Sequence, residues 1–293
     1  SERGDYAWQI FDAMSDLEAI HARIKLARER DAGFRGAAPL HEPVNRAYPR
    51  PQAPDLATIL AADGSQIYPN THSAALFYLT NVGVFVYHHG LDDLPEQITE
   101  PVLSYTEALL HDERGLVISN AAVNARRTVH EVQTLAREVW NRRTIGRPML
   151  AISDGPLLFW VGKDVPNGHR LQDDYLAAMV HLHDAHTALY NDSGHSASAI
   201  GYIDRPTSAF VVSLVYLMSL SPDDVRRAAL ETNGPLEGLT DQWLMFRLLR
   251  PGERSALFVQ QSPQNKRYRD RGESYEIVFF YVNVGQPHAY HLA

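Results

Sequence analysis

Apolar residues recur every three or four positions near the start of the chain, which predicts one long helix over residues 5–31. They form a stripe along this helix, made of Ile10, Ala13, Leu17, Ile20, Ile24 and Ala27. Such a stripe is typical of a helix that packs on its own core, or of one that binds a second protomer or a partner. A proline-rich stretch over 33–54 then predicts a stiff connector. We therefore expect an N-terminal region, 1–54, and a larger domain, 55–293.

The pattern after the connector changes to short uncharged stretches, and no Asp, Glu, Lys or Arg occurs from Gly64 to Leu91. Alternating apolar positions and turn residues predict a three-stranded antiparallel sheet. The predicted strands are 57–67, 74–80 and 83–88, with turns at 69–71 and 81–83. Because the sheet carries no charge, we expect both of its faces to be covered, at the centre of the core.

Helical spacing returns over residues 120–143, and a short apolar strand follows at 148–153. The later predicted elements are a helix at 171–190, a strand near 199–203, helices at 207–219, 222–230 and 240–249, and a hairpin of 255–260 with 275–284. Three antiparallel strands, a helix and a strand returning beside the first are typical of a ribonuclease H-like core. The predicted fold class is therefore mixed α/β, with a mixed central sheet.

Two predicted strands end in the same dipeptide, Asp63-Gly64 and Asp154-Gly155. Asp-Gly is also a common turn dipeptide, but here each follows a buried apolar strand and so lies at the rim of the sheet. If the two strands are neighbours, their carboxylates repel each other unless a cation lies between them. A divalent metal suits hard oxygen ligands and leaves positions open for water and phosphate. Asp63 and Asp154 are therefore candidate metal ligands and catalytic residues.

A third carboxylate would complete a site for two metal ions, and the helix before Asp154 offers Glu131 and Glu138 on one face. Glu131 is preferred, because Arg126 and Arg127 on the same helix could contact phosphate nearby. Glu138 could equally pair with Arg142 in solvent.

Charge and basic residues limit how nucleic acid could bind. The formal net charge is −8, which excludes a general coat of positive charge, so any contact must be local. The candidate phosphate contacts are Arg126, Arg127, Arg205, Lys266, Arg267, Arg269 and Arg271. Each could equally be a solvated surface residue, although Tyr268 within the last cluster favours nucleic acid.

Several other classes of site are excluded or disfavoured. The chain has no cysteine, which excludes disulfides, a thiol nucleophile, iron–sulfur clusters and thiolate zinc sites, and fits a reducing compartment. His181, His183 and His186 with Asp184 lack an evident third metal ligand, and the stretch from Gly155 to Lys163 lacks the spacing of a phosphate-binding loop.

Neither an export signal nor a membrane span is evident. The longest apolar run, Thr207–Ser221, is shorter than the roughly 20 residues a bilayer needs. We therefore expect a cytoplasmic protein without a membrane partner.

The chain resembles the NurA family of DNA-end-resection nucleases, of bacterial type, over residues 55–293. The resemblance rests on Ala-Asp-Gly-Ser-Gln-Ile-Tyr-Pro at 62–69 and Ile-Ser-Asp-Gly-Pro-Leu at 152–157. It is supported by Arg-Arg-x-x-x-Glu at 126–131 and by the hairpin at 252–282. It implies a ribonuclease H-like nuclease domain with two divalent cations, Mn²⁺ preferred and Mg²⁺ possible. Asp63 and Asp154 match its metal-binding aspartates, and Glu131 matches its intervening glutamate.

The resemblance further implies a toroidal homodimer that degrades DNA 5′ to 3′, cuts single strands, and works with the hexameric translocase HerA in end resection for double-strand-break repair. The sequence departs from the family pattern at two places. Pro156 replaces a serine, and the chain stops at Ala293 where the family continues into a helix that supplies another site residue. We therefore expect an incomplete C-terminal end.

The predicted function is hydrolysis of DNA phosphodiesters by a metal-dependent nuclease. One alternative is a non-catalytic subunit that docks on the translocase and stimulates it, which the N-terminal stripe and the acidic charge balance favour. Another is a ribonuclease, since the sequence does not reveal a group that reads the 2′-hydroxyl.

Overall fold

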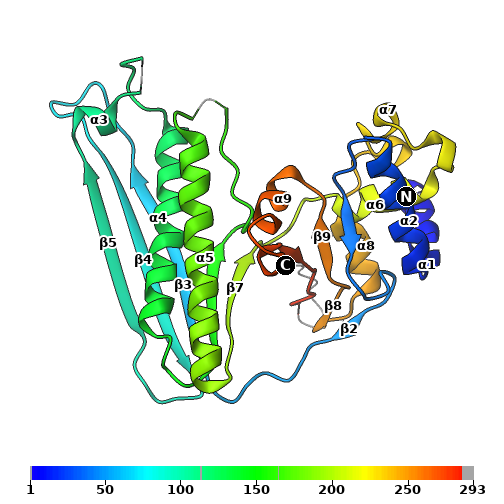
Figure 1. Ribbon diagram of the computed structural model, residues 1–293, viewed down its shortest axis with the longest axis horizontal. Coiled ribbons are helices and arrows are strands. Elements are labelled where there is room, and N and C mark those ends of the chain that lie inside the picture. The colour runs from blue at the N-terminus through cyan, green and yellow to red at the C-terminus, as the bar shows by residue number, and fades with distance from the viewer. Residues whose placement is uncertain (1, 113, 164, 286–293) are drawn as a thin grey trace. The chain divides into compact units, whose positions relative to one another are not determined.

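The computed structural model describes residues 2–112, 114–163 and 165–285, and the chain divides into two compact units (Figure 1). Unit 1 combines Ser1–Gln52 with Ile203–Ala293, and unit 2 is Ala53–Tyr202. The first boundary lies beside the expected division at residue 54. The C-terminal segment, however, belongs to the same compact unit as the N-terminal region.

Unit 2 is built on a five-stranded sheet in the order β5-β4-β3-β6-β7. Its strands are β3 (Ala57–Ile67), β4 (Tyr78–His89), β5 (Glu96–Ser104), β6 (Met149–Asp154) and β7 (Ala197–Tyr202). Strands β3, β4 and β5 pair antiparallel, whereas β6 runs parallel to both β3 and β7. This order confirms the predicted mixed α/β class and its ribonuclease H-like arrangement.

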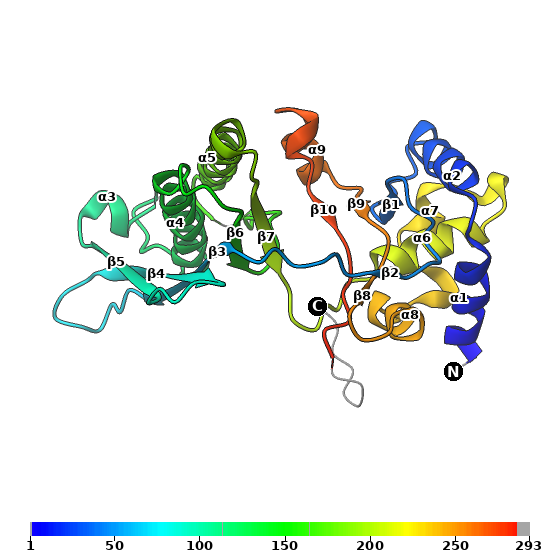
Figure 2. The ribbon, with the colours of Figure 1, turned by 90° about the horizontal axis from the view of Figure 1, so that it is seen from below.

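Two long helices, α4 (Asn120–Asn141) and α5 (Gly168–Ser193), lie side by side on one face of this sheet (Figures 1 and 2). The Ser119 hydroxyl caps α4 by accepting the Ala122 N–H at 3.2 Å. Alternate strand residues, among them Leu60 and Val84, are buried beneath the helices.

The expectation that both faces of the sheet are covered is wrong within unit 2. Phe85 and Tyr87, which alternate with the buried positions of β4, are 49% and 43% exposed. The absence of charge therefore did not require a second covering layer. We call this side of the sheet the open face. It is formed by the odd-numbered residues of β3 and β4 and by the residues of β5, β6 and β7 that pair with them across the sheet.

The predicted strands 74–80 and 83–88 are a single strand, β4, so the predicted turn at 81–83 is wrong. Asn81 pairs with Ser65 and Gly83 with Asp63, in an unbroken ladder. The third strand of the sheet is β5 instead, followed by the short helix α3 (Glu107–Leu110). Asn and Gly favour turns but tolerate an extended strand when both neighbours offer hydrogen bonds.

In unit 1 the predicted long helix is two helices, α1 (Glu2–Ala13) and α2 (Leu17–Glu29). The break occurs where the Asp16 carboxylate accepts the Ala19 N–H at 3.1 Å and caps α2. Ile20 and Ile24 of the stripe are buried in the hydrophobic core of unit 1. This part of the stripe therefore packs on the chain's own core.

The other elements of unit 1 are short. The proline-rich connector contains β1 (Ala37–Pro39), paired with β9 (Phe258–Gln260), and β2 (Tyr48–Pro49), paired with β8 (Glu253–Arg254). The predicted final hairpin is present as β9 with β10 (Val278–Phe279). The helical segments are α6 (Phe210–Ser219), η1 (Pro222–Asp224), α7 (Arg227–Leu230), η2 (Gly234–Leu236), α8 (Asp241–Leu248), α9 (Pro263–Arg269) and η3 (Glu273–Tyr275).

A buried carboxylate of α8 links this helix to α6 and to the segment after β10. Asp241, which is fully buried, accepts the Val212 N–H at 2.8 Å and the Tyr281 hydroxyl at 2.6 Å. Burial raises the pKa of Asp241 to about 6, although these hydrogen bonds oppose the shift. The apolar helix α6 begins next to this group.

None of the described helices is both long and apolar enough to cross a membrane.

Candidate active site

Asp63 and Asp154 lie next to each other on the open face of unit 2. Strands β3 and β6 are parallel neighbours, with Ala61 beside Ile152 and Ala62 beside Ser153. The next position in this register places Asp63 beside Asp154, on strands about 4.8 Å apart. Both residues are exposed. The expectation that the two strands are neighbours is therefore confirmed.

The surroundings of the two aspartates carry almost no charge. Across the sheet, Asp63 is flanked by Gly83 of β4, and Asp154 is flanked by Tyr202 of β7. Among the described strand residues of the open face, Asp63 and Asp154 are the only Asp, Glu, Lys or Arg. Two like charges are thus concentrated at one place, which favours a bound cation.

A hollow of about 560 Å³ opens at this place, and both aspartates line it. Its floor is formed by small or apolar residues such as Ala61 and Ile152. Carboxylate oxygens are the ligands that Mn²⁺ and Mg²⁺ take in proteins, and an open hollow leaves room for water and a phosphate. The donor set of Asp63 and Asp154 therefore fits a divalent cation.

Glu131 approaches the same region from helix α4, on the covered side of the sheet. Its carboxylate lies against Gly64, so close that a Cβ at residue 64 would be 2.1 Å from Glu131 Oε1. Burial raises the pKa of Glu131; Arg127 lowers it, and the charges of Asp63 and Asp154 raise it further. Glu131 is thus within electrostatic range of both aspartates.

The structure nevertheless does not gather the three predicted carboxylates into one cluster. Glu131 does not line the hollow that Asp63 and Asp154 share. No group of three His, Cys, Asp or Glu side chains suited to hold an ion occurs among the described residues. The strand alternation explains this difference, because residues 63 and 64 project to opposite faces of the sheet.

Arg127 connects Glu131 to the strand that carries Asp63. Its Nε lies 3.0 Å from Glu131 Oε1, and its Nη1 donates to Gln66 Oε1 at 2.6 Å. Gln66 in turn donates to the Tyr68 hydroxyl, which donates to Asn124 Oδ1, each at 2.8 Å. Sequence analysis gave Gln66, Tyr68 and Asn124 no role. The only available signal was the presence of the first two within the motif at 62–69.

The other predicted phosphate-contacting residues are divided between the two units. Arg126 of α4 donates to the Tyr78 hydroxyl at 2.6 Å and to the Leu109 carbonyl at 2.8 Å. These bonds tie its guanidinium to the first residue of β4 and to helix α3. Arg205, Lys266, Arg267, Arg269 and Arg271 all belong to unit 1. Their contact with DNA stays a prediction.

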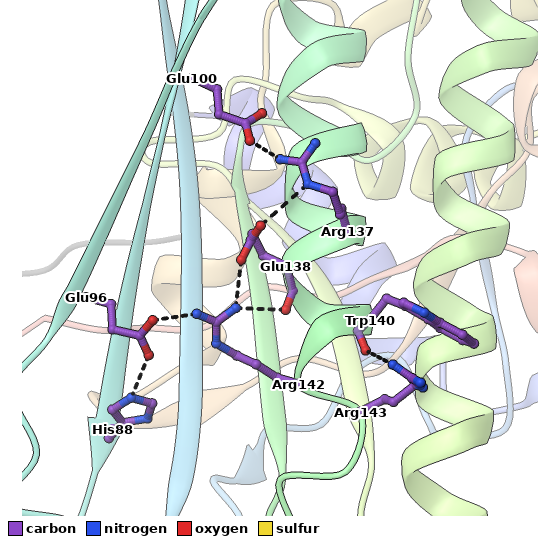
Figure 3. Close-up of polar contacts among 8 residues, drawn as sticks. All are labelled: His88, Glu96, Glu100, Arg137, Glu138, Trp140, Arg142 and Arg143. Carbon is purple, nitrogen blue, oxygen red and sulfur yellow. Dashed lines mark hydrogen bonds and ion pairs between the residues drawn. The ribbon is translucent and has the colours of Figure 1, made fainter.

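The alternative glutamate, Glu138, belongs to a separate network on α4 (Figure 3). It is buried and pairs with Arg142 at 2.8 Å, and Arg142 also donates to Glu96 of β5 at 2.6 Å. Glu96 then contacts His88 of β4 at 3.2 Å. Arg142 holds the pKa of Glu96 below its usual range against the effect of burial. Glu138 therefore holds Arg142, which fastens the end of α4 to the sheet, and Glu138 is buried rather than solvated.

The histidines of α5 also have structural contacts. His186 Nδ1 lies 3.1 Å from the Ala197 carbonyl oxygen and 3.2 Å from the Ala197 nitrogen, and the His181 ring packs against Trp140. Hydrogen bonding to β7 and ring packing account for the positions of these side chains.

The chain is similar to proteins of the NurA domain family. The NurA domain family model matches residues 57–290, and no curated protein matches the chain. A crystal structure of the NurA nuclease from Sulfolobus solfataricus is similar with a TM-score of 0.43 and 9% identity, over 97% of this chain and 79% of that one. A crystal structure of NurA with manganese is similar with a TM-score of 0.21 and 9% identity, over 86% and 53% of the chains. Because the family model covers most of the sequence, this chain belongs to the NurA domain family.

Proposed function

We propose that this protein is a metal-dependent DNA nuclease that hydrolyses phosphodiester bonds at Asp63 and Asp154. The observation that carries the proposal is the position of these two carboxylates, side by side on an otherwise uncharged sheet face. Membership of the NurA domain family supports it. A ribonuclease H-like sheet also places its functional residues at strand ends of this kind.

Each acidic residue would have its own task. Asp63 and Asp154 would hold divalent cations, two by the family resemblance and preferably Mn²⁺, through carboxylate oxygens in the hollow. Such ions supply Lewis acidity toward the phosphate and lower the pKa of bound water. Glu131 lies on the covered side of the sheet, outside the hollow, and would act on the site through its charge, which is within electrostatic range of both aspartates. Arg127 fixes the orientation of Glu131, and Gln66 fixes that of Arg127.

The finer features of the proposal rest on the resemblance of the motifs at 62–69 and 152–157 to the NurA family. They are 5′ to 3′ degradation, cutting within single strands, and action in DNA end resection. They also include a homodimer, a hexameric HerA-type translocase as partner, and a cytoplasmic location.

The test compares Asp63→Asn and Asp154→Asn with the matched control Asp92→Asn, which changes an exposed acid in the loop after β4. Cleavage of labelled single-stranded DNA is measured with Mn²⁺, with Mg²⁺ and after chelation. We expect chelation and either site variant to lower the rate at least 100-fold, whereas the control retains the wild-type rate. Unchanged cleavage in either site variant would refute the assignment.

Two further outcomes separate the alternatives. If purified wild-type protein never cuts DNA but raises the ATPase rate of the translocase, the chain is a stimulating subunit. If a matched RNA strand is cut faster than the DNA strand, the substrate is RNA.

A further inference from the structure

Two aromatic side chains lie on the open face beside the aspartate pair. Tyr202 of β7 is the direct neighbour of Asp154 across the sheet. Phe85 of β4 is the direct neighbour of Ala61, which precedes Asp63 by two positions on the same face. Both rings line the same hollow as the two aspartates. They therefore stand on either side of the place where the reaction is proposed to occur.

Both rings present an accessible surface. Phe85 is 49% exposed and Tyr202 is 42% exposed. Tyr87 continues the aromatic surface two positions beyond Phe85 on β4, at 43% exposure. Among the ring pairs found in the described part of the chain, neither Phe85 nor Tyr202 takes part. An exposed ring without a stacking partner, in a hollow whose only charged lining residues are the two aspartates, is suited to bind another flat apolar group.

Gly83 leaves space between Phe85 and Asp63. It is the neighbour of Asp63 on β4, and a Cβ at this position would meet only the Asp63 carbonyl oxygen, at 3.7 Å. Strand spacing puts Phe85 one strand across and two residues along from Asp63, a separation of about 8 Å between backbones. A nucleotide could thus place its phosphate at the carboxylates and its base on the Phe85 ring, without a clash at residue 83.

We propose that Phe85 and Tyr202 bind the bases that flank the scissile phosphate by stacking, so that the substrate at this site is an unpaired strand. This proposal rests on the proposed nuclease function. In a duplex each base face is already covered by the adjacent base pair, so the rings cannot reach it until the strand is unpaired. Stacking is also tolerant of sequence, because every base offers a π-face.

The experiment measures binding separately from cleavage. Fluorescence anisotropy gives the Kd of the full-length protein for a labelled single-stranded oligonucleotide in Ca²⁺, and for the same strand with abasic sites throughout. Loss of base stacking weakens binding about 5- to 160-fold per ring. We expect Phe85→Ala and Tyr202→Ala each to weaken binding to the normal strand by this factor. We expect little effect of either on the abasic strand.

Two controls separate stacking from packing. Tyr190→Ala removes a ring that is 59% exposed on α5, outside the open face, and should leave the Kd unchanged. Phe85→Trp keeps a π-face and should restore binding, whereas Phe85→Leu keeps only apolar bulk and should not. If Leu restores binding as well as Trp, or if alanine weakens binding to both strands equally, stacking is refuted.

Cleavage in Mn²⁺ distinguishes this proposal from the proposed function. A protein that cuts DNA but binds normal and abasic strands alike is a nuclease without a stacking site. A protein that binds with the expected pattern but does not cut has the stacking site without the nuclease activity. Equal affinity for blunt duplex and single strand, or no binding to either, would overturn the stacking proposal. A further result would overturn it: Phe85→Ala abolishes dimerisation and leaves the DNA affinity unchanged. The open face would then be covered by a second copy of the chain.

Discussion

Gly64→Ala tests whether the position of Glu131 matters for the reaction. The added Cβ would lie 2.1 Å from Glu131 Oε1, whereas ordinary van der Waals contact begins at 3.4 Å. The carboxylate must therefore retreat by about 1.3 Å. The same Cβ would lie 2.9 Å from Arg127 Cγ, so the paired side chains of Glu131 and Arg127 must move together. Because only side-chain atoms are displaced, we expect the fold to be retained. A displacement of about 1 Å at an active site lowers the rate by roughly 100-fold, which corresponds to about 2.7 kcal/mol of activation free energy.

The assay is single-turnover cleavage of single-stranded DNA in Mn²⁺, with urea unfolding to measure stability. We expect kcat to fall about 100-fold and the free energy of unfolding to change by less than about 2 kcal/mol. In a Glu131→Gln background, Gly64→Ala should add far less than in wild type, because both changes act on one group. A Gly64→Ala protein with full activity, or fully additive effects, would refute the role of Glu131.

Three other predictions concern the remaining polar groups. Asp241→Asn should remove a pH dependence of stability. Because the pKa of Asp241 is raised to about 6 in the folded protein, its protonated form stabilises the fold at pH 4 and below. This contribution is lost as the pH rises through 6. The stability of the variant relative to wild type should therefore rise by about 2 kcal/mol between pH 4 and pH 7 in urea unfolding, and a constant difference would contradict this. Glu138→Ala should destabilise the fold by about 3 kcal/mol, because it removes one of the two carboxylates that pair with the partly buried Arg142. The rate per folded molecule should not change; a lost rate without lost stability would make Glu138 the third site residue. Tyr68→Phe should lower kcat about tenfold by loosening the contacts that hold Arg127, with unchanged DNA affinity in the anisotropy assay, and an unchanged kcat would exclude this network from the reaction.

The sequence was most informative where one physical signal dominated. A short apolar stretch bounded by turn residues predicted β3 with its observed bounds, 57–67, and helical spacing predicted α4 to within two residues. It failed where two signals competed. The apolar stripe continues through 14–16, but the Asp16 cap breaks the helix there. Asn81 and Gly83 indicated a turn, but pairing on both sides keeps β4 extended.

The site was predictable in part for the same reason. An acid after an apolar strand predicts a position at the sheet rim, and Asp63 and Asp154 are neighbours as expected. Which side of the sheet Glu131 approaches depends on the packing of α4 against Gly64, which no local pattern encodes. The open face was not predicted either, because the sequence of an uncharged strand does not reveal how many of its faces are covered.

The central claim is that Asp63 and Asp154 together hold the divalent cation used in the reaction. A crystal structure of the protein soaked with Mn²⁺, with anomalous scattering to locate the metal, tests it most directly. We expect an anomalous peak in the hollow on the open face, with carboxylate oxygens of both aspartates about 2.2 Å from the metal. A peak coordinated by other residues, with neither aspartate in contact, would contradict it.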